Sequence, residues 1–239
     1  MFRITYKGHY TSDEQIIRRK SLPENAVEFG KISDLNSEFI RGFFLLLPVL
    51  AGMMAVTFLK FRGSAYHLAL GFDTLLAVLM GILAVCFLRQ VHEVIHALFY
   101  PPDAEKEIWK SKEHGAYFVY CEAEISRTRF VTMALAPVFA LGIIPFVLWL
   151  LLPQVIPMPY NIAVPFVFWM MTILGMGDAA NVYHVLKEVP AHARVFNHGL
   201  LRSFYILEPP DTKIDAVTAI PLVIAFSFFS SLINFGATL

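Results

Sequence analysis

The sequence predicts an all-α fold: a polytopic membrane protein with about five transmembrane helices and one short strand-like loop segment. Two observations predict this class. Hydrophobic residues make up 57% of the 239 residues and charged residues only 16%, whereas soluble proteins carry about 25% charged residues. The apolar residues also form runs long enough to cross a bilayer as helices, which takes about 20 residues.

The chain divides into a polar N-terminal segment, residues 1–37, and a membrane domain, residues 38–239. The polar segment has no apolar core, so we expect no cleaved signal peptide and insertion through the first membrane helix itself. Weak alternation over Phe2–Tyr6 favours a short strand. The formal net charge is zero, which does not favour a nucleic-acid partner. Cys86 lies in an apolar run and Cys121 in a polar loop, so we expect reduced thiols rather than a disulfide.

The first membrane helix is expected over residues 39–59, with a kink at Pro48. The second is expected over residues 66–99 and stops before Pro101 and Pro102, because proline removes a helical hydrogen bond and restricts the residue before it. A helix of that length extends about 50 Å, more than the roughly 30 Å of the hydrocarbon core. Its last turns are therefore expected at the membrane surface.

The remaining elements follow two polar stretches. Strand-forming residues gather at 115–121, within the first polar loop, and predict the strand-like segment. Three further membrane helices are expected over residues 130–152, 162–184 and 214–235. The second polar stretch, residues 185–213, separates the last two of these helices.

Lys and Arg residues are distributed unevenly between the two sides of this arrangement. The N-terminal segment and the loops 101–129 and 186–213 carry 6, 5 and 4 of them, whereas the first connection carries only Lys60 and Arg62. Because Lys and Arg accumulate on the cytosolic side of membrane proteins, five spans place the N-terminus in the cytosol and the C-terminus outside. The lipid bilayer is thus the first expected partner.

The segment His92-Glu93-Val94-Ile95-His96 ends the second apolar run. Two histidines four residues apart on a helix lie about 40° apart around its axis, so both rings can reach one ion. This is the H-E-x-x-H pattern of zinc hydrolases, in which the glutamate is the general base and the histidines are ligands. The alternative is a polar helix end with solvated or hydrogen-bonded histidines. The helical setting and the depth in the membrane favour Zn²⁺ binding by His92 and His96, with Glu93 as the catalytic residue.

A catalytic zinc site uses three protein ligands and leaves one position open. Asp178 is the expected third ligand, because it follows the apolar part of a helix that approaches the same side of the membrane. Small residues around it, such as Gly177 and Ala179, allow another helix to pack closely. His184 is the alternative ligand, although its spacing from Asp178 turns it to another face. Asn181, one turn after Asp178, is expected to orient the ligand or to contact the substrate carbonyl.

Several segments together resemble the family called putative zincin peptidase, a group of bacterial integral membrane proteins. The matching segments are Leu22–Val27, His92–Ala97, Ala136–Pro137, Gly177–Asp178 and Val185–Pro190. The pattern is also similar to that of the site-2 intramembrane metalloproteases, in which an aspartate from a later helix completes the zinc site. The resemblance implies these roles for His92, His96 and Asp178, and a location in the bacterial plasma membrane. The chain departs from the site-2 pattern in lacking an Asn-x-x-Pro stretch before an Asp-Gly pair.

We expect a metallopeptidase: a zinc-dependent, membrane-embedded endopeptidase that cleaves a membrane or membrane-associated protein near the cytosolic interface. The partner is then a protein or peptide substrate, which the segment 115–121 can hold by strand addition. One alternative is a non-catalytic zincin scaffold that acts as a binding or regulatory partner. A divalent-metal transporter would place acidic or histidine residues at mid-membrane on several helices. The third and fifth predicted helices have none.

Overall fold

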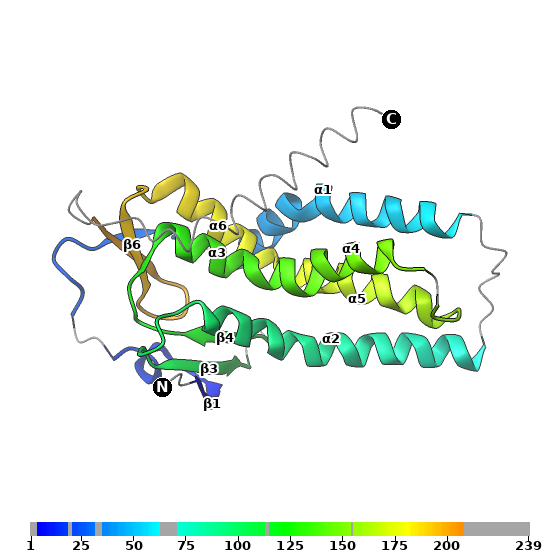
Figure 1. Ribbon diagram of the computed structural model, residues 1–239. Helices are drawn as coiled ribbons and strands as arrows, with labels where there is room; N and C mark the ends of the chain where they lie inside the picture. The colour runs from blue at the N-terminus through cyan, green and yellow to red at the C-terminus, as the bar shows by residue number, and fades with distance from the viewer. Residues whose placement is uncertain are drawn as a thin grey trace.

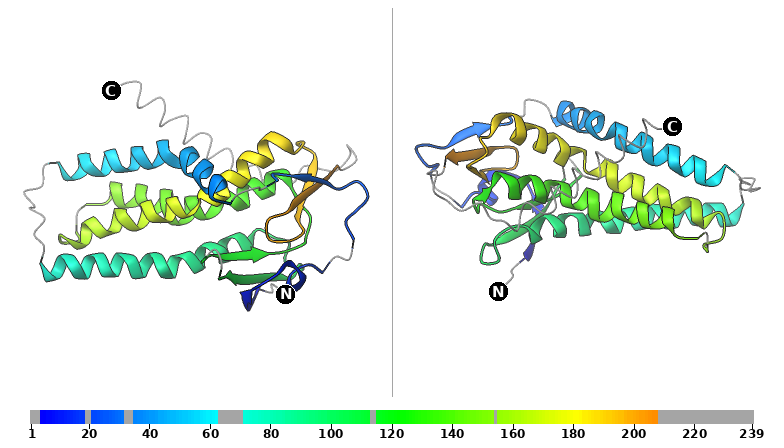
Figure 2. Two further views of the ribbon diagram at one scale, coloured as in Figure 1. Left: turned by 180° about the vertical axis from the view of Figure 1, so that it is seen from behind. Right: turned by 45° about the horizontal axis from the view of Figure 1, so that its top comes forward.

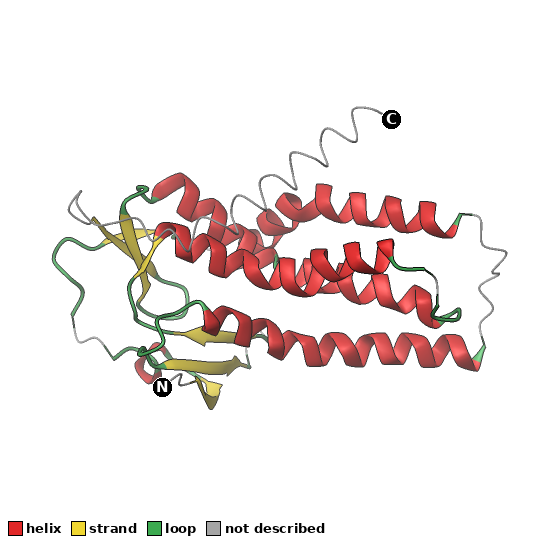
Figure 3. Cartoon of the chain, viewed as in Figure 1, coloured by secondary structure: helices red, strands yellow, loops and turns green. Residues whose placement is uncertain are grey.

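The computed structural model describes residues 4–18, 21–31, 35–62, 71–112, 115–153 and 155–207. Long helices run side by side through most of the molecule, and all the strands gather at one end (Figures 1 and 3). The same separation is visible from behind and from a tilted view (Figure 2). The fold is therefore mostly helical. It also contains two small sheets, so the all-α class predicted from the sequence is wrong in this respect.

Four helical segments are long and apolar enough to cross a membrane. They are α1 (Leu35–Phe61), α2 (Phe72–Leu98), the continuous run Arg127–Leu151, and the run Tyr160–Glu188. These segments correspond to the first four helices predicted from the sequence, with ends displaced by a few residues. The fifth predicted helix, residues 214–235, lies outside the described residues.

The third helical run is not uniform. It consists of α3 (Arg127–Pro137), the π-helical η2 (Val138–Ile143) and α4 (Ile144–Leu151). Pro137 ends the first part and Pro145 lies at the start of the last. Proline donates no backbone hydrogen bond, and the resulting gap in the helical ladder is a common place for a π-turn.

The fourth run is divided into α5 (Tyr160–Leu174) and α6 (Met176–Glu188), so the single helix predicted over 162–184 is two helices. Gly175 separates them. A Cβ atom at this position would lie 2.1 Å from the Val138 side chain, so only glycine lets the junction pack against η2. The break lies three residues before Asp178.

The strands form two separate sheets with the orders β1-β3-β4 and β2-β7-β6-β5. The first contains β1 (Ile4–Tyr10), β3 (Lys106–Ser111) and β4 (Tyr117–Tyr120), and the second contains β2 (Val27–Phe29), β5 (Ile125–Ser126), β6 (Ala193–Asn197) and β7 (Ser203–Leu207). β1 pairs with β3 in parallel, and the other neighbours are antiparallel. β4 forms an edge of the first sheet. A short 3₁₀ turn, η1 (Asp13–Gln15), follows β1.

The predicted strand at 115–121 is confirmed as β4, and the predicted N-terminal strand corresponds to part of β1. The hairpin of β6 and β7 was missed by the sequence analysis. Its signal is present in the sequence: apolar runs around Phe196 and Tyr205 flank a turn at Gly199, whose φ angle is +103°. The polar residues between these runs made the whole stretch resemble a loop.

α1 and α6 approach each other closely at Gly42. A Cβ atom on Gly42 would lie 1.7 Å from the Met176 carbonyl oxygen, so the crossing requires a glycine. On the sheet side, α6 packs into a core shared with the four-stranded sheet, through buried residues such as Val185, Val195 and Phe29. These two contacts fix the position of α6, which carries Asp178.

Candidate metal centre

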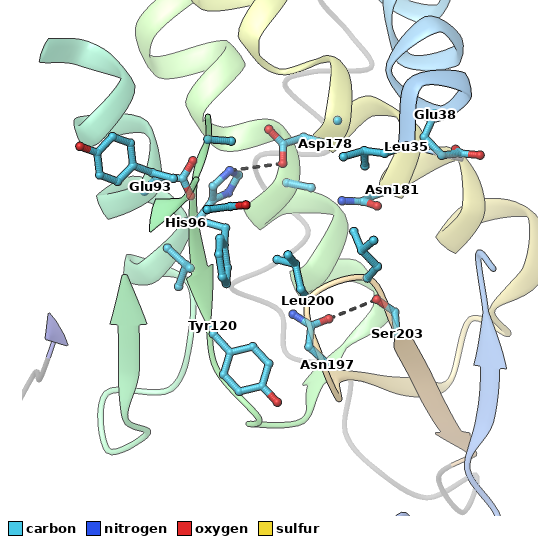
Figure 4. Close-up of a pocket in the computed structure, with 18 of the residues that line it drawn as sticks. Leu35, Glu38, Glu93, His96, Tyr120, Asp178, Asn181, Asn197, Leu200 and Ser203 are labelled. Atoms are coloured by element: carbon cyan, nitrogen blue, oxygen red, sulfur yellow. Dashed lines mark hydrogen bonds and ion pairs between the residues drawn. The ribbon is translucent and has the colours of Figure 1, made fainter. Parts of the chain in front are cut away.

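A cavity of about 470 Å³ lies where the helices meet the sheets. Its walls come from the first turns of α1 and α3, the last turns of α2, the start of α6, strand β4, and the turn between β6 and β7. Figure 4 shows side chains from α1, α2, α6, β4 and this turn around one space, among them Glu93, His96 and Asp178. The H-E-x-x-H segment and Asp178 thus line the same cavity.

His92 and His96 both lie on α2 and both are buried. Their ring centroids are 4.7 Å apart and the ring planes are inclined by 76°. This is the result expected for residues one helical turn apart on one face. Glu93 lines the same cavity as His92, His96, Asp178 and Arg89.

Asp178 reaches both histidines from α6. Its Oδ2 atom lies 3.0 Å from His92 Nε2, and its Oδ1 atom lies 3.3 Å from His96 Nε2. One ligand atom from each of these residues can be chosen so that all three lie within 4.8 Å of one another. In a tetrahedral zinc site with bonds of about 2.0–2.1 Å, two ligand atoms are roughly 3.3 Å apart. The three side chains therefore fit Zn²⁺ in donor type and in spacing.

The other ring nitrogens of the two histidines differ in their surroundings. His96 Nδ1 lies 3.0 Å from the carbonyl oxygen of Met133 on α3 and donates to it. This bond directs Nε2 toward Asp178, as the outer hydrogen bond of a metal-binding histidine does. His92 Nδ1 is buried and has no hydrogen-bond partner among the described residues. Packing and Asp178 therefore hold the His92 ring.

Arg89 joins α2 to the edge strand β4. Its Nη1 donates to the carbonyl oxygen of Gly115 at 3.2 Å, and its guanidinium lies 5.0 Å from the centroid of the Tyr117 ring. Because Arg89 is one turn before Glu93 on α2, these contacts fix the distance between Glu93 and β4. The sequence analysis assigned no role to this arginine.

The structure places the two remaining candidate residues differently. Asn181 lines the cavity one turn after Asp178 and is solvent-exposed. His184 also lines the cavity, but it lies apart from the three grouped side chains. Its Nε2 lies 2.9 Å from Glu38 and its Nδ1 lies 2.7 Å from Glu188. The alternative ligand thus forms a separate link between α1 and α6.

This link contains further contacts that sequence reasoning missed. Arg41 Nη1 lies 3.3 Å from Glu38 and 2.8 Å from His184 Nε2. Glu188 also accepts a hydrogen bond of 2.9 Å from the backbone N–H of Gly30, at the end of β2. Glu38 is buried. The network connects α1, α6 and the second sheet beside the cavity, and no spacing in the sequence brings these residues together.

The β6–β7 turn (residues 198–202) forms the wall opposite β4. The backbone N–H of Leu200 donates to Asp13 Oδ1 at 2.8 Å, and that of Gly199 donates to the Tyr120 hydroxyl at 3.4 Å. Burial raises the pKa of Tyr120 above its usual range, so its hydroxyl stays protonated and donates to Glu122 at 3.0 Å. The turn is therefore fixed to both η1 and the end of β4.

Cys121 directly follows β4 and is buried in the core shared by α6 and the second sheet. Burial raises the pKa of its thiol. A protonated buried thiol is a weak nucleophile and a poor metal ligand. Cys121 is not a member of the group of His92, His96 and Asp178.

Comparison with protein-family models matches residues 85–194 to the family described as "Putative zincin peptidase". The matched segment contains the H-E-x-x-H residues, strand β4 and Asp178. This is the family that the sequence resembles, and the match covers 110 of the 239 residues. The similarity to site-2 proteases stays a prediction. Neither a curated protein nor a solved structure matches this chain.

Proposed function

Because residues 85–194 match the putative zincin peptidase family, we propose that this protein is a zinc-dependent endopeptidase held in a membrane by its apolar helices. The proposed substrate is a membrane or membrane-associated protein, cut near the surface on the side where the sheets lie. The positive-inside distribution of Lys and Arg makes that side the cytosol.

One observation carries the proposal: His92, His96 and Asp178, from two different helices, offer ligand atoms within 4.8 Å of one another beside Glu93. Two imidazoles and a carboxylate, with one position left open, are the donor set of catalytic zinc sites. A structural zinc site would instead be closed by four protein ligands. The arrangement therefore supports chemistry on a bound substrate.

When bound, zinc supplies Lewis acidity toward a water molecule and toward the substrate carbonyl. His92, His96 and Asp178 would hold it. Glu93 would accept the proton of the attacking water at its carboxylate and donate it to the nitrogen of the leaving amine. The Met133 carbonyl would keep Nδ1 of His96 protonated, so that its Nε2 presents a lone pair to the site.

The substrate backbone would be held by β4. This strand pairs only with β3 among the described strands, so its other edge is available. An extended peptide added there would form main-chain hydrogen bonds and lie along the cavity that Glu93 lines. Asn181, on the opposite side of Asp178, would donate from its amide to the substrate carbonyl. Strand addition at residues 115–121 and the carbonyl contact of Asn181 are both roles that the sequence analysis predicted.

The variant Glu93→Gln tests the proposal against the alternative of a non-catalytic scaffold. Removing a general base costs about 10²–10⁴ in rate, and glutamine at position 93 leaves the three ligands in place. We therefore expect hydrolysis of casein, used as an unfolded protein probe, to fall by about 10²-fold or more. Zinc content, measured by mass spectrometry on the detergent-purified protein, should stay at the wild-type level.

Glu105→Gln is the matched control, because Glu105 is an exposed loop residue that pairs only loosely with Lys7 at 3.9 Å. It should retain wild-type hydrolysis. If wild type and Glu93→Gln cleave equally, Glu93 is not the base. If the zinc-loaded wild type cleaves nothing, the scaffold alternative replaces the peptidase.

A further inference from the structure

About half of the cavity lining comes from parts of the chain outside the apolar spans. Strand β4, the end of β2 and the β6–β7 turn all lie outside the four candidate membrane helices. The helices contribute residues such as Leu35, His96 and Met133, and the junction of α5 and α6 contributes Leu174 and Asp178. The part of the cavity along β4, where a paired peptide would lie, is outside the candidate spans.

The two walls of this space are joined at one end. The Tyr120 hydroxyl, at the last residue of β4, accepts from the Gly199 backbone in the β6–β7 turn. Asp13 holds the same turn through Leu200, and a Cβ atom on Gly199 would lie 2.6 Å from Asp13 Oδ2. The turn is thus a fixed wall of the cavity at the end of β4.

Apart from the candidate metal centre and the residues around His184, much of the cavity lining is apolar. Phe29, Phe118, Phe130, Leu200 and Leu201 line the cavity. Among the described lining residues the only Lys or Arg is Arg89, and its guanidinium donates to the Gly115 carbonyl. A pocket with these walls discriminates against charged side chains, because a buried charge needs a partner.

We propose that the substrate segment is an extended, apolar stretch outside the hydrocarbon core, next to a membrane anchor on the sheet side, and not the membrane helix itself. A helix inside the bilayer keeps its carbonyls in internal hydrogen bonds and cannot pair with β4 until it unwinds. A juxtamembrane segment can be extended already. Leu201 in the β6–β7 turn selects the apolar side chain. This inference rests on the proposed peptidase function.

The test uses the full-length, zinc-loaded protein reconstituted with two single-span reporter proteins. Both reporters carry the same short Leu, Phe and Val block, placed in one between Gly and Ser residues beside the span and in the other at the centre of the span. Mass spectrometry of the products gives the rate and position of cleavage. We expect the juxtamembrane block to be cut at least tenfold faster, next to an apolar residue.

Leu201→Lys tests whether Leu201 selects an apolar side chain of the substrate. Leu201 is 38% exposed, so a lysine there can keep its charge in water and the fold is expected to be retained. Loss of one apolar pocket contact changes kcat/KM by roughly tenfold or more. The variant should lose about that factor on the apolar block and gain activity on a block in which one residue is replaced by glutamate. Leu207→Lys, at an exposed site of β7 outside the cavity lining, should change neither rate.

Equal or faster cleavage at the centre of the span would overturn this inference and leave the peptidase function standing. Unchanged specificity in Leu201→Lys would overturn the role of the turn. Absence of cleavage of both reporters and of casein by the zinc-loaded wild type would overturn the peptidase function, and this inference with it.

Discussion

At the scale of single residues, the candidate centre combines residues whose relative positions follow from one helix with residues that only the packing of distant helices brings together. His92, Glu93 and His96 were assigned from their spacing, their helical setting and their expected depth, because a helix fixes the relative directions of residues one turn apart. Asp178 was inferred from its expected depth, and the structure places it 3.0 Å from His92 Nε2. The neighbours of His184 could not be inferred, since Glu38 meets it only through the crossing of two helices that are distant in the sequence.

The first prediction separates the two candidate third ligands. Asp178→Ala removes a carboxylate that touches both histidines, so we expect zinc content to fall from near one per chain to a small fraction of that value. His184→Ala should retain the zinc, because both ring nitrogens of His184 face Glu38 and Glu188 instead. Metal analysis of the purified variants decides the matter. Zinc that stays in the first variant and leaves the second would reverse the assignment.

At the scale of elements, the candidate metal centre depends on how α1 and the broken α5–α6 run are packed. The sequence predicted the apolar spans, because length and composition suffice to identify them. It did not predict the break at Gly175 or the close approach at Gly42, which arise from contacts between helices. The hairpin β6–β7 was missed because the polar residues between its two apolar runs made the whole stretch resemble a loop.

Gly42→Ala tests the close approach of α1 and α6. The added methyl group would lie 1.7 Å from the Met176 carbonyl oxygen, so α1 must move away from the helix that carries Asp178. Overpacking of this kind costs about 1–3 kcal/mol. We expect a melting temperature lower by several degrees and weaker zinc retention, measured by thermal unfolding in detergent and by metal analysis.

Gly52→Ala is the matched control on the same helix, because a Cβ atom there meets nothing within 4 Å. Alanine is the better helix former by about 1 kcal/mol, so this variant should be as stable as wild type or more stable. Equal destabilisation by the two substitutions would mean that the crossing at Gly42 is not close.

At the scale of the whole molecule, the arrangement of the chain across the membrane follows from the number of spans. Four candidate spans are present among the described residues, and with four spans residue 207 lies on the same side as β1. That agrees with the structure, in which strands from the N-terminal segment and from residues 193–207 share one end of the molecule (Figure 1). A fifth span over residues 214–235 would carry the C-terminus to the opposite side.

Reporter fusions measure this arrangement. Alkaline phosphatase is active only when exported, so a fusion after Leu207 should be inactive and a fusion after Leu239 should be active. A green fluorescent protein fused at the same two positions should give the reverse pattern. Activity of alkaline phosphatase at position 207 would contradict the assignment of the sheet side to the cytosol. Inactivity at both positions would remove the fifth span.

The pairing of the strands also determines when the walls of the cavity can be completed during synthesis. β1 must wait for β3, since Ile4 pairs with Lys106, and β2 must wait for β7, since Val27 pairs with Tyr205. Contacts between such distant residues form late, and domains assemble as the chain emerges. The wall opposite β4 is therefore absent from a ribosome-bound chain until residue 207 has left the ribosome. A nascent chain would therefore lack one wall of the cavity until β7 has emerged and paired with β2 and β6.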